Sequence, residues 1–204
     1  KHHLGQISQG AHQFRFTGRF GLFVDIQRIY QQLKAKISRV ISRKNVNQED
    51  QIVPLTNKQG QILTPEFYVV GSLCGGSGAG MFMDIAYLLK MAYYQLSGGR
   101  GKPSMVGIQL TPEAFTQIAI DPNVNATGRL EANGYASLVE AFYFMNKEKF
   151  PPTKSAKDIL TQDRRNKLMV NFGPVGKSHD ATTFGSTCEE TPFDQLYLLG
   201  TSSL

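Results

Sequence analysis

The sequence predicts an α/β fold, a three-layer sandwich with a mostly parallel sheet. Helical patterns alternate with short β-rich apolar runs along the chain, which is the order that parallel strands joined by crossover helices require. The run at residues 67–70 is apolar throughout, as in a strand buried on both faces. A glycine-rich segment follows it at once, so a loop is expected at the carboxyl edge of the sheet, where such folds bind ligands.

Each expected element follows from periodicity and from turn signals. Apolar residues at steps of three and four predict the helices, and Gly98 with Gly99 ends the second of them. The expected helices span residues 20–44, 81–96 and 129–146. The expected strands span residues 67–70, 105–110 and 193–199. Residues 45–65 are polar and predict a loop or weak hairpin, whereas 147–192 predict an insertion with a short helix at 156–162.

Length and composition fit one globular domain or part of one. The chain has 204 residues, of which 41% are hydrophobic, and we interpret residues 1–204 as a partial domain of a longer protein. It contains no apolar run of about 18 residues, the length a membrane span needs, and no signal peptide is visible. Cys74 and Cys188 are too few for a disulfide scaffold, so reduced thiols and a cytoplasmic location are expected.

Basic charge is concentrated between Arg28 and Lys44, within a net charge of +6. The simpler interpretation is the solvated face of an amphipathic helix. Contact with nucleic acid or with a membrane surface is the alternative. The four histidines have no metal-ligand spacing with the cysteines, so no metal site made of protein side chains is expected.

The glycine-rich segment at residues 74–80 is the candidate phosphate loop. A strand, a glycine loop and a helix in this order direct backbone N–H groups and the positive end of a helix dipole at one point, where an anion fits. The glycines are expected either at positive φ or where a ligand approaches the backbone, so Gly78→Val should abolish binding and leave the protein folded. The alternative is a turn or close helix–strand packing. The expected phosphate-binding residues are Gly75, Gly76, Ser77, Gly78, Ala79 and Gly80.

Two commoner phosphate loops do not match. A Walker loop ends in Gly-Lys-Ser/Thr, but Gly80 is followed by Met81 and Phe82. The Rossmann spacing G-x-G-x-x-G is absent as well. Asp84 lies one turn into the expected helix, where it either complements the helix N-terminus or supports Mg²⁺ through water. Cys74 is interpreted as a small loop residue rather than a nucleophile.

The loop resembles the tubulin signature G-G-G-T-G-S-G, and three further segments occur in the order that the tubulin/FtsZ family requires. Residues 10–19 resemble the FtsZ loop that reads G-A-G and then G-[RK]. Residues 128–133 resemble the segment that opens a helix near the ribose, and 193–201 resemble the strand V-D-S-L-I-V-I-P-N. The chain is most similar to bacterial tubulin-like proteins of unknown role, through G-A-G-M-F, R-x-x-A-N-x-Y-A-x-L and P-F-D-x-x-Y-L-L.

The resemblance implies a protein that binds GTP or GDP with Mg²⁺ and self-associates head to tail into filaments. The residues it places over the terminal phosphate are Gly10, Ala11 and His12. The residues it places near the ribose are Arg129, Glu131 and Asn133. In that family an acidic loop of the next subunit completes the site for hydrolysis, and the resemblance places this loop outside residues 1–204, so GTPase activity is favoured but left open. A non-hydrolysing scaffold with partner proteins, and a DNA-partitioning filament, are the alternatives.

Overall fold

The computed structural model describes residues 11, 13–43, 53–54, 64–99, 101–115, 127–146, 168–171, 185–188 and 191–200. The expected helix at 156–162 lies outside these residues, as do Gly10 and His12 of the expected terminal-phosphate segment. The insertion expected at 147–192 stays a prediction, since only parts of it are described.

Three parallel strands form the sheet beside the candidate loop. They are β3 (Glu66–Ser72), β4 (Ser104–Leu110) and β7 (Gln195–Leu199), in the order β3-β4-β7. Val69 is paired with Gly107, and Gly107 with Leu196, so the three strands run in register. The α/β fold with a parallel sheet is confirmed, and each of the three strands lies where the sequence predicts it.

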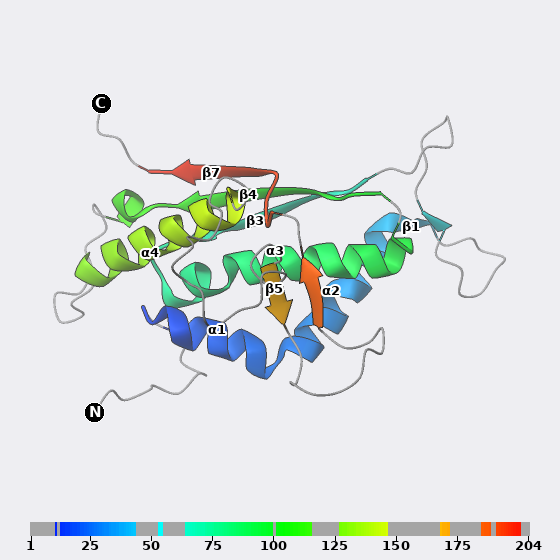
Figure 1. The fold of residues 1–204 in the computed structure, drawn as a ribbon, viewed down its shortest axis with the longest axis horizontal. Helices are drawn as coiled ribbons and strands as arrows, with labels where there is room; N and C mark the ends of the chain where they lie inside the picture. The colour runs from blue at the N-terminus through cyan, green and yellow to red at the C-terminus, as the bar shows by residue number, and fades with distance from the viewer. Residues whose placement is uncertain are drawn as a thin grey trace, which may run out of the picture.

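Two layers of helices lie on one side of this sheet (Figure 1). Next to the strands are α3 (Gly76–Ser97) and α4 (Thr127–Met145), and beyond α3 are α1 (Arg15–Val24) and α2 (Ile26–Ile41). Both crossovers, β3-α3-β4 and β4-α4-β7, step across the sheet in the same direction. Because such crossovers are right-handed, they place α3 and α4 on the same face.

The other face of the sheet is open within the described chain. Tyr68 is 56% exposed and Val70 is 71% exposed, although both lie in the run expected to be buried on both sides. That expectation was wrong for the described chain because no described crossover returns in the opposite direction to cover this face. Only the inward residues of β3, such as Val69, reach the core.

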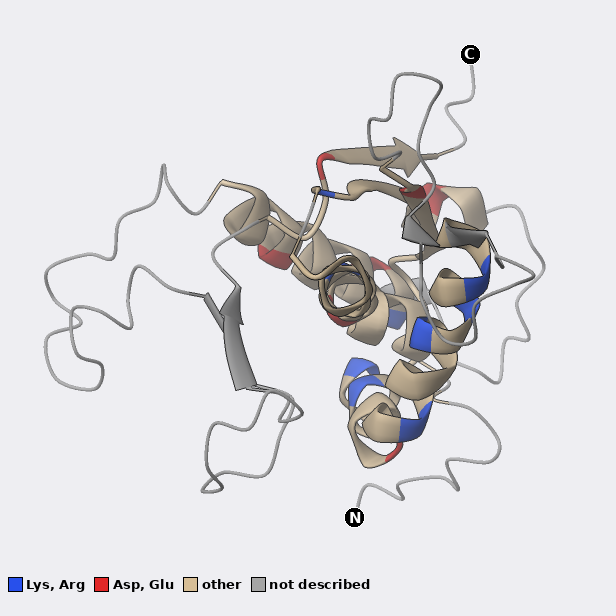
Figure 2. Cartoon of the chain, turned by 90° about the vertical axis from the view of Figure 1, so that its right-hand side faces the viewer, with Lys and Arg blue, Asp and Glu red and all other residues tan. Residues whose placement is uncertain are grey.

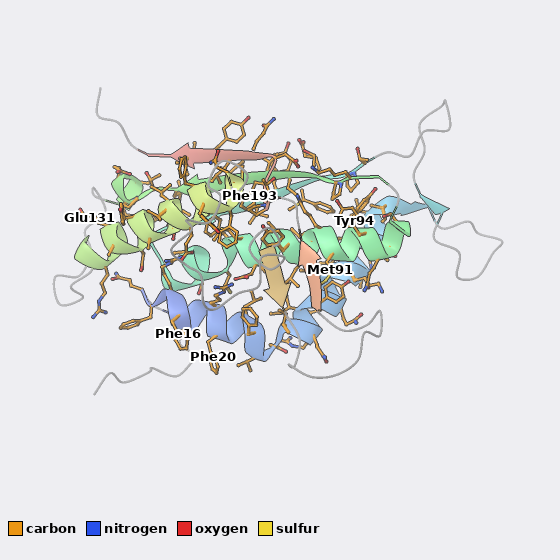
Figure 3. The ribbon with its side chains drawn as sticks, viewed as in Figure 1. Phe16, Phe20, Met91, Tyr94, Glu131 and Phe193 are labelled. Atoms are coloured by element: carbon orange, nitrogen blue, oxygen red, sulfur yellow. The ribbon has the colours of Figure 1, made fainter. Side chains whose placement is uncertain are left out.

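Helix α3 is buried on nearly all sides because it lies between the sheet and the α1–α2 layer. Its sheet side, with Phe82 and Ala86, packs on Met105 and Phe193. Its opposite side forms a second cluster with α1 and α2. That cluster has at its centre Leu22, Ile26, Tyr30, Tyr87 and Leu88. Figure 3 shows Phe193 between β7 and the helices. Because α3 is buried on two sides, the single buried stripe expected for this helix is too narrow.

Element boundaries differ from the expected ones at two places. The helix expected over 20–44 is two helices, which meet at Asp25, and α3 begins at Gly76 instead of 81. It ends as predicted, with Gly98 in the left-handed conformation at φ 62°. Two antiparallel strand pairs and a 3-10 helix complete the description. They are β1 (Ser42–Arg43) with β2 (Val53–Pro54), β5 (Leu168–Asn171) with β6 (Gly185–Cys188), and η2 (Pro112–Phe115).

Positive charge gathers on the α1–α2 layer (Figure 2). Arg28, Lys36 and Arg39 are exposed there, which agrees with the solvated helix face expected from the sequence. None of the helices in the described chain is both long and apolar enough to span a bilayer.

Candidate functional site

The candidate loop joins the carboxyl end of β3 to the first turn of α3. Ser72 ends the strand, and Gly75 is the N-cap of the helix with extended backbone at φ −83° and ψ 158°. Among the described residues no side chain caps this helix end, and its first turn contains no acidic residue. The N–H groups of Gly76, Ser77 and Gly78 precede the first helical donor, Ala79, which bonds to Gly75 O at 3.0 Å. They form a positive helix end that suits an anion.

Ser77 is the loop residue that the fold leaves accessible. It is exposed on the first turn of α3, whereas Gly76 and Ala79 are buried and Gly75 is half-buried. A hydroxyl at this position can donate to a phosphate oxygen without losing an internal contact. The structure thus brings together the residues 75–80 that the sequence selected, with Ser77 as their polar side chain.

The glycines of the loop are needed for close packing within the protein. An added Cβ at Gly76 would lie 2.7 Å from Ala11 O, and one at Gly80 would lie 2.4 Å from Arg15 O. On α1, an added Cβ at Gly18 would lie 2.3 Å from Gly76 O. Helices α1 and α3 therefore cross with their backbones in contact. The spacing Gly76-x-x-x-Gly80, which puts two glycines on one helix face, is the sequence signal for this crossing.

Positive φ does not account for these glycines. Among the glycines of the described chain it occurs at Gly98, Gly99 and Gly101. An added Cβ at Gly78 would lie 2.3 Å from Ser72 O, so valine there would collide with the end of β3. The expectation that Gly78→Val leaves the fold intact is therefore wrong, and the packing alternative weighed for the glycines has structural support.

The upstream segment, whose described residues are Ala11, Gln13 and Phe14, lies directly against the glycine loop. Ala11 is buried, and its carbonyl accepts a hydrogen bond of 2.9 Å from Phe14 N. Gln13 follows, with a buried Oε1 that has no hydrogen-bond partner within the described chain. A buried acceptor of this kind calls for a donor from water or a ligand. Ala11 therefore lies beside the glycine loop, and its place over a terminal phosphate stays a prediction.

Three residues of α4 were expected near a ribose. Asn133 donates from Nδ2 to Gln13 O and to Cys74 O, each at 2.8 Å. Arg129 places its guanidinium 4.7 Å from the centre of the Phe14 ring, a cation–π contact. Glu131 is exposed, and Figure 3 shows it on the side of α4 away from the centre of the molecule. The structure therefore places Asn133 and Arg129 at the upstream segment, and the amide hydrogens of Asn133 are already engaged.

Two ion pairs hold α1 against α3 and α4, and no pattern in the sequence indicates either pair. Arg15 pairs with Glu140 of α4 and also donates from Nε to Ala79 O at 3.3 Å. Arg19 pairs with Asp84 of α3 at 2.9 Å. Burial raises the pKa of Asp84, although Arg19 acts in the opposite direction. Asp84 thus ties α3 to α1, and neither role considered for it from the sequence applies, because α3 begins earlier than expected.

Cys74 and Glu113 complete the surroundings of the loop. Cys74 is 1% exposed, and burial raises the pKa of its thiol, which fits the predicted role of a small loop residue. Glu113, in η2 directly after β4, also acts on that thiol through its charge. A hydrogen bond from the Thr111 hydroxyl lowers the pKa of Glu113, so its exposed carboxylate is ionised at neutral pH. The sequence signal for it was an acid just past a strand, at the carboxyl edge of the sheet.

No group of three His, Cys, Asp or Glu side chains able to hold a metal occurs among the residues that the structure describes. A cation brought by a nucleotide would have its phosphates and water as ligands, with Glu113 as the exposed carboxylate at this edge of the sheet.

Comparison with known proteins identifies the family. A family of proteins described as tubulin-like matches the chain over residues 1–204, its full length. No curated protein and no solved structure matches it. The parallel sheet, the glycine loop at the N-terminus of α3 and this match agree with one another. The chain belongs to the tubulin-like family.

Proposed function

We propose that this protein binds GTP or GDP, with its phosphates at the first turn of α3, and assembles head to tail into filaments. The observation that carries the proposal is the uncapped start of α3. Within the described chain no side chain caps its N–H groups, its first turn contains no acidic residue, and the Ser77 hydroxyl stands exposed beside them. Anionic phosphate oxygens supply the acceptors that this helix end lacks.

The choice of guanine and of the contacts beyond the phosphates comes from the family. Gly10, Ala11 and His12 are proposed to close over the terminal phosphate, with Arg129, Glu131 and Asn133 near the ribose. Mg²⁺ is proposed as an ion carried by the nucleotide. When bound, it would neutralise phosphate charge, while the loop N–H groups and Ser77 orient the phosphates.

Hydrolysis is proposed to occur at the contact between successive subunits. Two carboxylates beneath the loop, Asp84 and Glu140, are held in ion pairs with arginines, which makes them poor general bases. A carboxylate from the next subunit is the proposed partner of the attacking water, and the exposed Glu113 of the same subunit is the alternative. Head-to-tail contacts of this kind need not close into a ring and can grow into filaments.

A concentration series tests this proposal. GTP turnover and pelleting of the full-length protein should be measured together, and turnover per subunit should rise as polymer appears. Glu113→Gln is the control for a base within the same subunit: it should leave the concentration dependence in place. Turnover that is constant per subunit, without pelleting, would reject assembly-dependent hydrolysis and leave a nucleotide-binding scaffold that works with partner proteins.

The basic α1–α2 layer favours a second candidate, a DNA-partitioning filament. Arg28, Lys36 and Arg39 are exposed on one layer of the molecule (Figure 2). Retention on DNA that weakens steeply with salt, and that Lys36→Glu with Arg39→Glu removes, would support it. A cytoplasmic location is part of the proposal for either candidate.

A further inference from the structure

Asn133 joins two segments that lie far apart in the sequence. From the second turn of α4, its Nδ2 atom donates to Gln13 O of the upstream segment and to Cys74 O of the glycine loop, at 2.8 Å each. An asparagine amide has two N–H donors, so both are used in this bridge. The side chain therefore holds the two segments at a fixed distance from each other.

Contacts on three successive turns of α4 hold this helix in place around Asn133. An added Cβ at Gly134 would lie 2.5 Å from Cγ of Pro112, so α4 packs tightly on η2 at the carboxyl edge of the sheet. One turn further, Ser137 is fully buried and its Oγ lies 3.5 Å from Ala79 O. The Arg15–Glu140 ion pair ties the next turn to α1. Asn133 thus extends from an anchored helix.

The bond to Cys74 O also sets the direction of an N–H group in the loop. A peptide unit is planar and trans, so its carbonyl and its N–H point in opposite directions. The Cys74 carbonyl belongs to the same peptide as the Gly75 N–H, which has no acceptor within the described chain. Fixing the carbonyl toward Asn133 turns this N–H away from Asn133, one residue before Gly76 and Ser77, whose N–H groups also have no acceptor within the described chain.

We propose that Asn133 is a positioning residue that aims the Gly75 N–H at a bound phosphate and couples phosphate binding to the position of segment 11–14. This inference rests on the proposed nucleotide site. Because binding and ordering are linked, a nucleotide in the loop should make segment 11–14 more rigid, and loss of the bridge should weaken both effects together.

The test uses full-length protein, with GDP as the ligand, and the variant Asn133→Leu. Leucine keeps the approximate size of the side chain, removes both donors and adds no charge. Asn133→Ala is the second variant, in case leucine does not fit. Asn146→Leu is the matched control, since Asn146 also donates to a carbonyl, Phe142 O at 2.9 Å, but at the far end of the same helix. GDP affinity and amide hydrogen exchange of peptides covering 11–16 are measured for each.

In the parent and in Asn146→Leu, GDP should bind and slow exchange in residues 11–16. In both Asn133 variants the dissociation constant should rise about tenfold, the effect of losing one or two hydrogen bonds. At saturating GDP, the slowing of exchange should be lost. Folded Asn133 variants that bind GDP and protect 11–16 as the parent does would overturn the coupling. A parent that binds no nucleotide would instead reject the proposed function, and the coupling with it.

Discussion

Replacing Ser77 by aspartate should stabilise the protein and abolish nucleotide binding. Ser77 is exposed at the second position of α3, so the substitution removes no packing. A carboxylate in the first turn of a helix contributes about 0.3–1 kcal/mol through the dipole. For a domain of this size the melting temperature should rise by about 1–4 °C.

The same carboxylate would occupy the place proposed for the phosphates. Two unit charges about 4 Å apart repel by about 4 kcal/mol at an effective dielectric constant of about 20. Allowing for screening by salt, the affinity for GDP should fall at least about a hundredfold. A rise in melting temperature together with a loss of GDP affinity distinguishes a phosphate site from a loop that serves only the fold.

The assay combines thermal unfolding without nucleotide and equilibrium binding of labelled GDP. Ser77→Ala should bind within a few-fold of the parent, because the backbone N–H groups remain. Ser97→Asp, at the other end of α3, should lower the melting temperature and leave binding unchanged. If Ser77→Asp binds GDP as tightly as the parent, the phosphates do not lie at the first turn of α3.

Three further substitutions test the packing and the electrostatics around the site. Gly18→Ala places a methyl group 2.3 Å from Gly76 O and should cost about 1–3 kcal/mol in urea unfolding; an unchanged midpoint would show that α1 and α3 are not in backbone contact. Phe193→Ala removes a fully buried ring that stacks 6.0 Å from Phe82 and should cost about 3–5 kcal/mol, whereas a cost below about 1 kcal/mol would contradict this packing. Burial raises the folded-state pKa of Asp84 above its ordinary value, so the folded state binds more protons there and stability falls as pH rises through the folded pKa. Asp84→Asn should therefore gain stability relative to the parent as pH rises from about 4 through the folded-state pKa, and a difference that is constant with pH would contradict the raised pKa.

The order of the elements was predictable because local patterns determine it. The apolar runs that form β3, β4 and β7 carry their own signal, and the glycine loop marks the edge of the sheet. The break at Asp25 was not predictable from periodicity, because the apolar spacing continues from α1 into α2. The start of α3 was missed because glycines argue against a helix, although here they permit the contact with α1.

The position of the candidate site in the chain was predictable, but the side-chain contacts around it were not. Residues 75–80 have the composition and position of a phosphate loop, which a single sequence shows. The bonds from Asn133 to Gln13 O and Cys74 O join positions 120 and 59 residues apart, and Arg15 meets Glu140 across 125 residues. Such pairs depend on how α1, α3 and α4 pack, and no spacing rule within one segment reports them. The exposure of Tyr68 and Val70 on the open face of the sheet was missed for the same reason. The sequence of an apolar strand does not show which elements pack on it.

The central claim is that the first turn of α3 holds the phosphates of a guanine nucleotide, and equilibrium dialysis of the full-length protein against labelled GTP, GDP and ATP measures it most directly. The account predicts saturable binding of GTP and GDP at one site per chain, weaker binding of ATP, and competition by the unlabelled guanine nucleotides. A preference for ATP would contradict the assignment of the base alone. The absence of binding by all three nucleotides at near-millimolar concentration would contradict the phosphate site itself.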